Sequence, residues 1–422
     1  MGKLRDKQRD LLAFKNAARG SRSPIKSINS ARKRLPVETY PEAARWLETA
    51  APKGRHVTGP SFPSSLQEIH RFWRLDPLEL EEEFIWAASR ILLHTERINK
   101  FTEAGREISM LVMQSDYLSA LDRLNDIERA VGSSLWGLKL RLALLQRAEG
   151  FDGQKRFALQ VRGLNPDGLV NYVAHYVSIR NETALSPGSF RSLFERHRSD
   201  DDIPPDLAAY TTFHVLPGLV SERQRARDLL SWEGAGSVID LFETAVRLSG
   251  YLFNSSPLDF QSAAGPVIHL LAKQINDPRL YGLDAVYTGS WPVGRFAKLD
   301  LAPFDAFLEG RYGDAIDYAE RAIGSTELCW EYLDVIGRAA AAGGKSLPSR
   351  PSTFAWDISS WMYLHLAQDA KGAQANEHML RIAYNWEGLQ WADRAYGFLA
   401  TEVASSGITR VQNSSYLSEC TG

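Results

Sequence analysis

The side chains that could bind a metal or act as nucleophiles are scattered along the 422-residue chain. Five histidines on predicted helices have no histidine or cysteine partner three or four residues away, so we expect each to be packed or hydrogen-bonded. They are His94, His175, His214, His269 and His365. Two cysteines exclude a four-cysteine zinc site, and Cys329 is predicted to be a buried thiol. Phosphate-loop, nucleophile-elbow, zinc-protease and dinucleotide motifs are missing, so the sequence predicts no catalytic residue, no metal and no cofactor.

Two short stretches resemble catalytic motifs of helical enzymes. The segment 201–206, Asp-Asp-Ile-Pro-Pro-Asp, resembles the magnesium motif of terpene synthases, but its prolines break the helix that such a motif needs. We therefore expect an acidic loop there. Arg191 and His197 have the spacing of some helical ribonucleases of the HEPN class. An exposed basic helix end is the simpler interpretation, and the ribonuclease is a minor alternative.

Tryptophan is unusually frequent, and six of the eleven lie in the last third of the chain. All-helical toroids of this length stack sugars on tryptophan, with two carboxylates flanking the scissile bond. Asp357, Glu387 and Asp393 could supply such carboxylates. We expect core packing, with a carbohydrate cleft and an exposed partner-binding patch as the alternatives. The six residues are Trp291, Trp330, Trp356, Trp361, Trp386 and Trp391.

The net charge of −2 hides a basic N-terminal arm, residues 1–35. Its eleven basic and two acidic residues give +9, which leaves −11 on the other 387 residues. We expect the arm to be a solvated extension, to lie across the chain's own acidic body, or to bind an acidic partner, a nucleic acid or a membrane surface. The residues predicted for polyanion or partner binding are Lys3, Arg5, Lys7, Arg9, Arg19, Arg22, Arg32, Lys33 and Arg34.

The elements that must position these residues are helices. Apolar residues recur at three- and four-residue spacing through most of the chain, as in helices packed on one side. Asp76-Pro77 and Ser256-Pro257 are predicted helix starts, and Glu81, Glu82 and Glu83 complement a helix dipole. The predicted long helices span 99–130, 135–149, 168–181, 237–253, 259–275, 304–323, 328–342, 355–369, 373–386 and 389–404.

Strand signals are nearly absent, and residues 285–288 are the best candidate, too short for a sheet. Proline and glycine predict breaks at 185–206 and 343–352. The sequence contains no run of 18 apolar residues, so it predicts no membrane-spanning helix. We divide the chain into a basic arm (1–50), a linker (51–65), two helical segments (66–199 and 206–345), C-terminal helices (353–405) and a flexible tail (406–422).

A helical-hairpin period is the clearest internal pattern. An aromatic turn at 115–117 leads into a helix with a small-residue packing face, and a similar pattern follows 34 residues later. The best single copy is Gly310-Arg311-Tyr312 with the alanines that follow it. The residues predicted to shape the hairpins are Tyr117, Ala120, Phe151, Pro166, Gly310, Tyr312, Ala315 and Ala322.

These residues resemble the tetratricopeptide repeat (TPR). That repeat has a Gly-x-Tyr turn and closes with Asp-Pro, and Leu164-Asn165-Pro166 is similar to this closure. Degenerate copies around 100–166 and 299–345 carry the resemblance, while Pro303 and Glu327 depart from the pattern. The resemblance implies an all-α, right-handed helical-hairpin array (α-solenoid) whose concave face binds peptides or partner proteins.

Together these patterns favour a cytoplasmic, non-enzymatic scaffold, sensor or regulatory subunit of a multi-protein system. It would bind a protein partner through the groove of a helical-repeat array with a basic N-terminal arm. Three alternatives stay open: a nucleic-acid-associated protein that uses residues 1–35, an (α/α)-toroid carbohydrate-active enzyme with a tryptophan-lined cleft, and a HEPN-like ribonuclease.

Overall fold

A computed structural model describes most of the chain, and its described part is all-helical without a strand. The described residues are 8–16, 24–49, 59–69, 74–164, 168–200, 205–216, 222–289, 300–325, 330–344, 353–367, 372–389 and 392. The helices are α2 (Pro24–Arg32), α3 (Tyr40–Thr49), α4 (Leu80–Ile91), α5 (Thr95–Met113), α6 (Tyr117–Val131), α7 (Leu135–Ala148), α8 (Gly150–Leu164), α9 (Leu169–Arg180), α10 (Pro187–Asp200), α11 (Pro205–Val215), α12 (Arg223–Glu233), α13 (Val238–Ser255), α14 (Pro257–Asp259), α15 (Gly265–Ala272), α16 (Pro278–Thr288), α17 (Ala302–Leu308), α18 (Tyr312–Ser325), α19 (Trp330–Ala342), α20 (Phe354–Leu366) and α21 (Gly372–Asn385).

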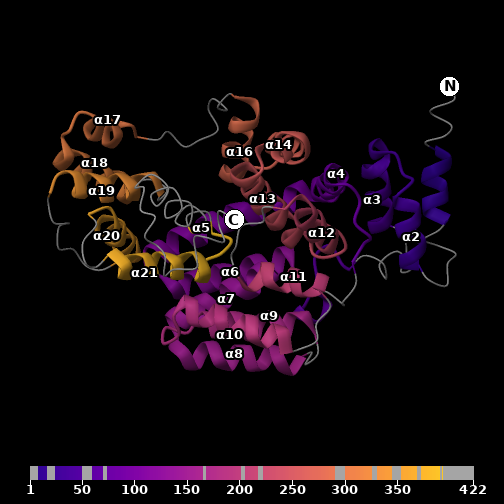
Figure 1. Cartoon of the computed structure of the whole chain (residues 1–422), viewed down its shortest axis with the longest axis horizontal. Helices are drawn as coiled ribbons and strands as arrows, with labels where there is room; N and C mark the ends of the chain where they lie inside the picture. The colour runs from indigo at the N-terminus through magenta and orange to yellow at the C-terminus, as the bar shows by residue number, and fades with distance from the viewer. Residues whose placement is uncertain are drawn as a thin grey trace.

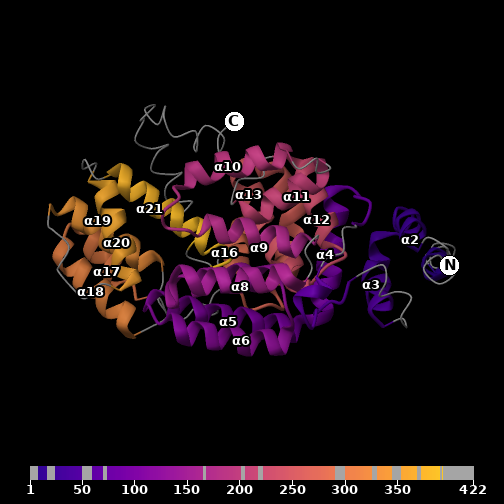
Figure 2. The same ribbon diagram turned by 90° about the horizontal axis from the view of Figure 1, so that it is seen from below.

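The helices form an elongated molecule, with α2 and α3 at one end and α17 to α19 at the other (Figure 1). Each helix from α5 to α9 packs against the next one along the chain, and so does each from α17 to α21. Figure 2 shows α5, α6, α8 and α9 lying in stacked rows. The two runs of helices meet where α20 contacts α5 and α21 contacts α7.

Four apolar clusters hold these helices together, and the smallest joins Tyr176 of α9, Phe190 of α10 and Val215 of α11. The largest joins α4 to α9 with α11, α12, α13, α15 and α16, and it also includes residues of α19 to α21. A second cluster, around Phe14, Tyr40 and Trp86, fixes the N-terminal helices against α4. A third fills the space between α17, α18, α19 and α20. The C-terminal helices therefore have a core of their own next to the main one.

The strand candidate 285–288 was wrong, because these residues form the end of α16. Asp277 caps that helix by accepting a hydrogen bond from the Arg279 backbone N–H at 2.8 Å, and Pro278 occupies its first turn. Leu280 and Ala285 are buried on its packed face. A strong helix start and tertiary packing override the β-propensity of a short Ala-Val-Tyr-Thr run.

Further expectations also need correction. The predicted helix 304–323 is divided into α17 and α18, because the chain turns at Gly310, whose φ is 75°. The predicted helix 99–130 is divided into α5 and α6, because the chain turns at Ser115, whose φ is 64°. The predicted break 185–206 contains the helix α10, which begins at Pro187 because proline suits a first helical turn. Charged and polar residues along α10 concealed its helical pattern in the sequence.

The predicted helix start at Asp76 also differs from the structure. The helix α4 begins at Leu80, and Glu82 accepts a hydrogen bond from the Glu79 backbone N–H at 3.2 Å. Asp76 instead accepts hydrogen bonds from Asn29 Nδ2 and Lys33 Nζ, both at 3.0 Å. The second predicted start was correct, since Ser256 precedes Pro257 at the beginning of α14.

Residues 59–65, the described part of the predicted linker, form backbone hydrogen bonds with residues beside the helices. The Val238 N–H donates to the Ser61 carbonyl at 2.9 Å, and the Ser133 N–H donates to the Pro63 carbonyl at 2.7 Å. Gly132 has a φ of 79°, and a Cβ there would lie 2.4 Å from the Pro63 oxygen. This close approach needs glycine.

No helix in the described part of the chain is long and apolar enough to cross a membrane.

Candidate functional site

Three buried cations from three helices meet one carboxylate at the centre of the molecule. Lys139 of α7, Arg180 of α9 and Arg247 of α13 all contact Glu387, which follows α21. Lys139 Nζ lies 3.0 Å from Glu387 Oε1 and Arg180 Nη1 lies 3.3 Å from Oε2. The exposed fraction of all four side chains is 10% or less. We call the three basic residues the cationic socket.

The packing of α13 on α7 sets the position of two socket residues. Asp240 accepts hydrogen bonds from the backbone N–H groups of Leu135 and Trp136, at 2.9 and 3.0 Å. These N–H groups open α7 and have no partner inside the helix. Because Asp240 of α13 caps α7, the register between the two helices is defined, and Lys139 and Arg247 lie one to two turns further along.

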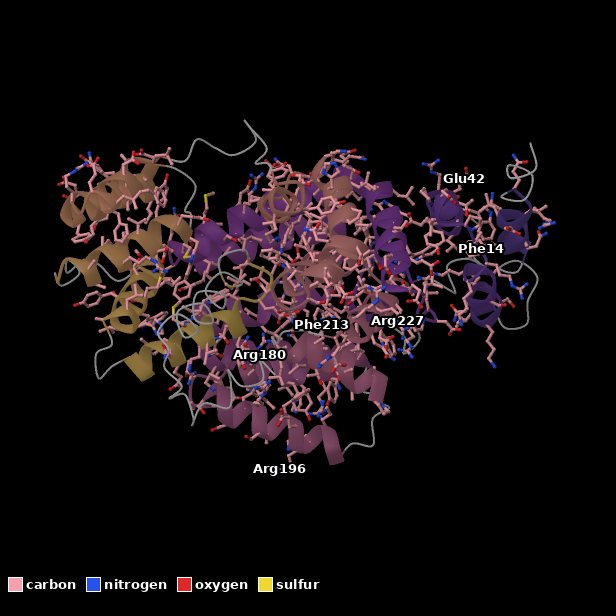
Figure 3. The ribbon with its side chains drawn as sticks, turned by 45° about the horizontal axis from the view of Figure 1, so that its top comes forward. Phe14, Glu42, Arg180, Arg196, Phe213 and Arg227 are labelled. Carbon is pink, nitrogen blue, oxygen red and sulfur yellow. The ribbon has the colours of Figure 1, made fainter. Side chains whose placement is uncertain are left out.

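The two socket arginines also bind the end of α11. Arg180 Nη1 donates to the Val215 carbonyl at 2.8 Å, and Arg247 Nη2 donates to the Phe213 carbonyl at 2.9 Å. Carbonyls in the last turn of a helix lack helical partners and carry partial negative charge, so they suit cations. Figure 3 shows Arg180 and Phe213 in the middle of the molecule. The arginines are thus held in place on two sides.

The socket brings three basic side chains to one carboxylate. Burial, with the positive charges of Arg247 and Arg180, lowers the pKa of Lys139, and burial lowers the pKa of Arg180 to about 9. Arg180 Nη2 is buried without a hydrogen-bond partner among the described residues. The neighbouring carboxylate of Glu243 is bound by the Arg279 guanidinium at 2.6 and 2.8 Å. Within the described part of the chain, Glu387 is the carboxylate that all three basic side chains contact.

Glu387 belongs to a short segment, residues 386–389, that we call the docking segment. Trp386 and Leu389 are each 1% exposed and flank the glutamate as apolar anchors. The Trp136 indole N–H donates to the Gly388 carbonyl at 3.2 Å. Gly388 has a φ of 89°, and a Cβ there would lie 2.5 Å from the Trp136 ring. The cavity beside the segment measures about 20 Å³, enough for one or two water molecules.

A second buried pair lies beside the socket. His214 Nε2 lies 2.9 Å from Glu233 Oε1, which also accepts a hydrogen bond from Tyr210 at 2.8 Å. Burial lowers the pKa of His214 to about 4, despite the opposing effect of Glu233. His214 Nδ1 is buried without a partner among the described residues, so a proton added there would have no acceptor. The neutral Nε2–H form fits the site.

This pair predicts a loss of stability at acidic pH. The pKa of His214 is lower in the folded chain than the ordinary 6.5, so its contribution to stability is complete above pH 6.5 and falls as the pH drops toward 4. Between pH 7 and 4 we expect His214 to account for about 3 kcal/mol of lost unfolding free energy. Urea unfolding of the wild type and of His214→Gln, which keeps a donor and does not titrate here, measures the difference. Equal pH dependence of the two proteins would contradict this prediction.

The predicted polyanion-binding residues have varied positions. Arg9 and Arg34 are exposed, whereas Lys33 pairs with Asp76 at 3.0 Å. Arg32 is completely buried and pairs with Glu83, which is also completely buried. Arg32 of α2 and the following Lys33 thus contact the acidic side chains of Glu83 and Asp76. Lys3, Arg5, Lys7, Arg19 and Arg22 lie outside the described residues.

Most of the predicted hairpin residues that the structure describes lie at turns or on packed faces. Tyr117 begins α6 after the turn at Ser115, and Tyr312 begins α18 after Gly310, whose φ is 75°. The small residues Ala120, Ala315 and Ala322 are buried. In contrast, Phe151 is 52% exposed, and Pro166 lies outside the described residues.

The residues considered for catalysis have structural partners where they are described. His94 contacts Glu48, His269 contacts Asp284, His365 contacts Asn376, and the ring of His175 packs against Tyr176. Arg191 pairs with Glu195, and His197 bonds to the Tyr176 hydroxyl at 3.2 Å. No group of three metal-ligating side chains occurs in the described ranges. Asp201, Asp202, Cys329 and Asp393 lie outside them.

The described tryptophans of the last third lie mainly in packed regions. Trp330 and Trp386 are buried in the main core. Trp361 is partly buried and stacks on His378, with ring centroids 4.7 Å apart. Trp356 is partly buried against the C-terminal core. Trp291 and Trp391 lie outside the described residues.

Lys139, Arg180 and Arg247 were not identified as a site from the sequence. Lys139 and Arg180 are 41 residues apart, and Arg180 and Arg247 are 67 residues apart, so no local motif contains them. One signal was present: Lys139 interrupts the apolar run Leu138-Lys139-Leu140 on a helix buried on nearly all sides. A charged residue in such a position requires a buried partner.

Comparison of the chain with protein-family models, with curated proteins and with solved structures finds no match.

Proposed function

We propose that this chain is a cytoplasmic, non-enzymatic interaction protein that binds an acidic segment of a partner at the cationic socket. It would act as a scaffold, sensor or regulatory subunit of a multi-protein system. The single observation that carries the proposal is the convergence of Lys139, Arg180 and Arg247 on one carboxylate. Their three helices form a surface that already holds a peptide-like segment of the chain itself.

The contacts of the docking segment define the chemistry of such a partner. A glutamate carboxylate enters the socket, a backbone carbonyl accepts from the Trp136 indole, and apolar side chains flank the glutamate. An acidic residue followed by glycine, with a large apolar residue on either side of this pair, would make the same contacts. Charge-assisted hydrogen bonds to several donors are stronger than neutral ones, so the carboxylate should dominate recognition.

The proposed architecture is a TPR-like, right-handed array of helical hairpins. Consecutive packing from α5 to α9 and from α17 to α21 supports it, as do the buried alanines Ala120, Ala315 and Ala319 between adjacent helices. In such an array one surface is built from successive helices, which suits extended segments of a partner. The docking segment would compete with that partner for the socket, because both need the same three cations.

The test uses the full chain with Glu387→Ala, which removes the chain's own carboxylate from the socket, and an acetylated, amidated peptide of residues 383–392. We expect calorimetry to show that this glutamate peptide binds about ten-fold more tightly than the same peptide with glutamine at position 387. The glutamine peptide lacks the carboxylate that the three basic side chains bind. The wild type should bind the peptide more weakly, since its own segment has a high effective concentration.

Two controls make the result specific to the socket. Adding Lys139→Met to the Glu387→Ala chain should weaken binding of the glutamate peptide, because one cationic donor is gone. Glu387→Gln, which preserves the side-chain shape, replaces Glu387→Ala if the latter is unfolded by circular dichroism. Equal binding of the glutamate and glutamine peptides to the folded variant would overturn the proposal.

A further inference from the structure

A second cavity lies away from the socket, at the seam between the main core and the C-terminal core. We call it the seam cavity, and it measures about 250 Å³. It is bounded by the end of α5, by α18 and α19, and by the first turns of α20. Met113 and Leu333 belong to the main core and Ile336 to the C-terminal core. It is more than ten times as large as the cavity beside the docking segment.

The walls of the seam cavity are mainly apolar, with one aromatic side chain, Trp356. Six of its ten lining residues are apolar, and the other four are polar or charged. A pocket lined by apolar groups with a few polar ones is the usual form of a small-molecule site. The cavity is therefore of a size and character that suits a small organic ligand.

Ser359 provides a polar group in this apolar setting. Its residue is 1% exposed, and its Oγ is buried without a hydrogen-bond partner among the described residues. Other helical serines of this chain donate to the carbonyl four residues earlier, as Ser89, Ser109 and Ser249 do at 2.7 to 2.9 Å. A buried hydroxyl without a partner is costly, so the Ser359 hydroxyl suits a ligand that hydrogen-bonds to it.

Charge narrows the ligand class further. Of the described residues that line the seam cavity, Glu320 alone is ionisable, and no lysine, arginine or histidine is among them. An anion placed there would lose its hydration without gaining a cationic partner. Phosphates and fatty acids are therefore unsuitable, and a neutral molecule is favoured.

We propose that the seam cavity binds a small neutral amphiphile with an apolar body and one hydroxyl or carbonyl group. The apolar body packs against Met113, Leu333 and Ile336, and the polar group hydrogen-bonds to Ser359. The ligand would contact α5 on one side and α18 to α20 on the other, so it would stabilise the packing of the C-terminal helices on the body. This inference is independent of the socket and of the partner-binding proposal.

The test measures binding of three eight-carbon probes to the full chain by calorimetry. The probes are 1-octanol, octanoate and octylammonium, which share one apolar chain and differ in charge. We expect 1-octanol to bind about ten-fold more tightly than octanoate, because the anion must give up its hydration. Equal affinity of 1-octanol and octanoate, no binding of 1-octanol, or tightest binding of octylammonium would overturn the proposal.

Variants locate the binding and identify the hydrogen bond. Ala355→Leu fills the cavity and should abolish 1-octanol binding. Ser359→Ala should weaken the binding of 1-octanol several-fold. It should leave the binding of benzene unchanged, because benzene forms no such hydrogen bond. This variant also tests the site if Ala355→Leu fails to fold. Unchanged 1-octanol binding in the folded variants would contradict the site. The probe measurements use the wild-type chain, in which Glu387 occupies the socket, so their outcome is separate from the test of the socket.

Discussion

Replacing Glu387 with alanine is expected to lower the free energy of unfolding by about 3–5 kcal/mol. The substitution leaves Lys139, Arg180 and Arg247 buried without the carboxylate that all three contact. Removing one partner of a buried ion network is costly because the remaining charges stay desolvated. Chemical unfolding followed by circular dichroism measures the loss.

A glutamate of the neighbouring helix provides the matched control. Glu377 of α21 pairs with Arg381 one turn away, and its side chain is 45% exposed. Glu377→Ala should cost less than about 1 kcal/mol, as exposed ion pairs do. Adding Lys139→Met to Glu387→Ala should recover part of the loss, since one unpaired cation is removed. A Glu387→Ala chain as stable as Glu377→Ala would contradict the role of Glu387.

Replacing Arg32 with methionine should have an effect of similar size, about 3–5 kcal/mol, at the other end of the molecule. Arg32 and Glu83 are both completely buried, and the Arg32 guanidinium also lies 4.8 Å from the centre of the Trp86 ring. Glu83 accepts a further hydrogen bond from the Leu78 N–H at 2.7 Å. Without Arg32, the Glu83 carboxylate is buried with no cation in contact.

The adjacent lysine is the control for this pair. Lys33→Met removes a pair with Asp76 in which both side chains are 52% exposed, so it should cost less than about 1 kcal/mol. The double variant Arg32→Met/Glu83→Leu should be more stable than Arg32→Met, because no unpaired charge remains. If Arg32→Met and Lys33→Met are equally stable in urea, the buried pair does not hold the N-terminal helices.

Local features of the sequence predicted much of the helical structure. The start at Ser256 and the extents of α7, α9 and α13 follow from capping residues and from apolar spacing, which depend on near neighbours in the chain. The strand candidate 285–288 failed because a four-residue window did not include the helix start at Asp277. Local propensity is a weak guide when packing extends an element.

The candidate site was not predictable in the same way. Arg180 and Glu387 are 207 residues apart and meet only because α21 packs against α7. Glu83 illustrates the same limit, since its position near a helix start predicts a favourable dipole effect, whereas in the structure it also binds the buried Arg32. Contacts between distant helices follow from tertiary packing, which periodicity does not specify.

The most direct test of the account is the place where the acidic peptide binds. A peptide of residues 383–392, with a benzophenone side chain in place of Trp386, is photo-crosslinked to the Glu387→Ala chain and the products are mapped by mass spectrometry. The rings of Tyr117 and Phe354 lie 6.2 and 5.8 Å from that of Trp386, so crosslinks are predicted at these two residues. Crosslinks elsewhere, with none at Tyr117 or Phe354, would contradict recognition of an acidic segment at the cationic socket.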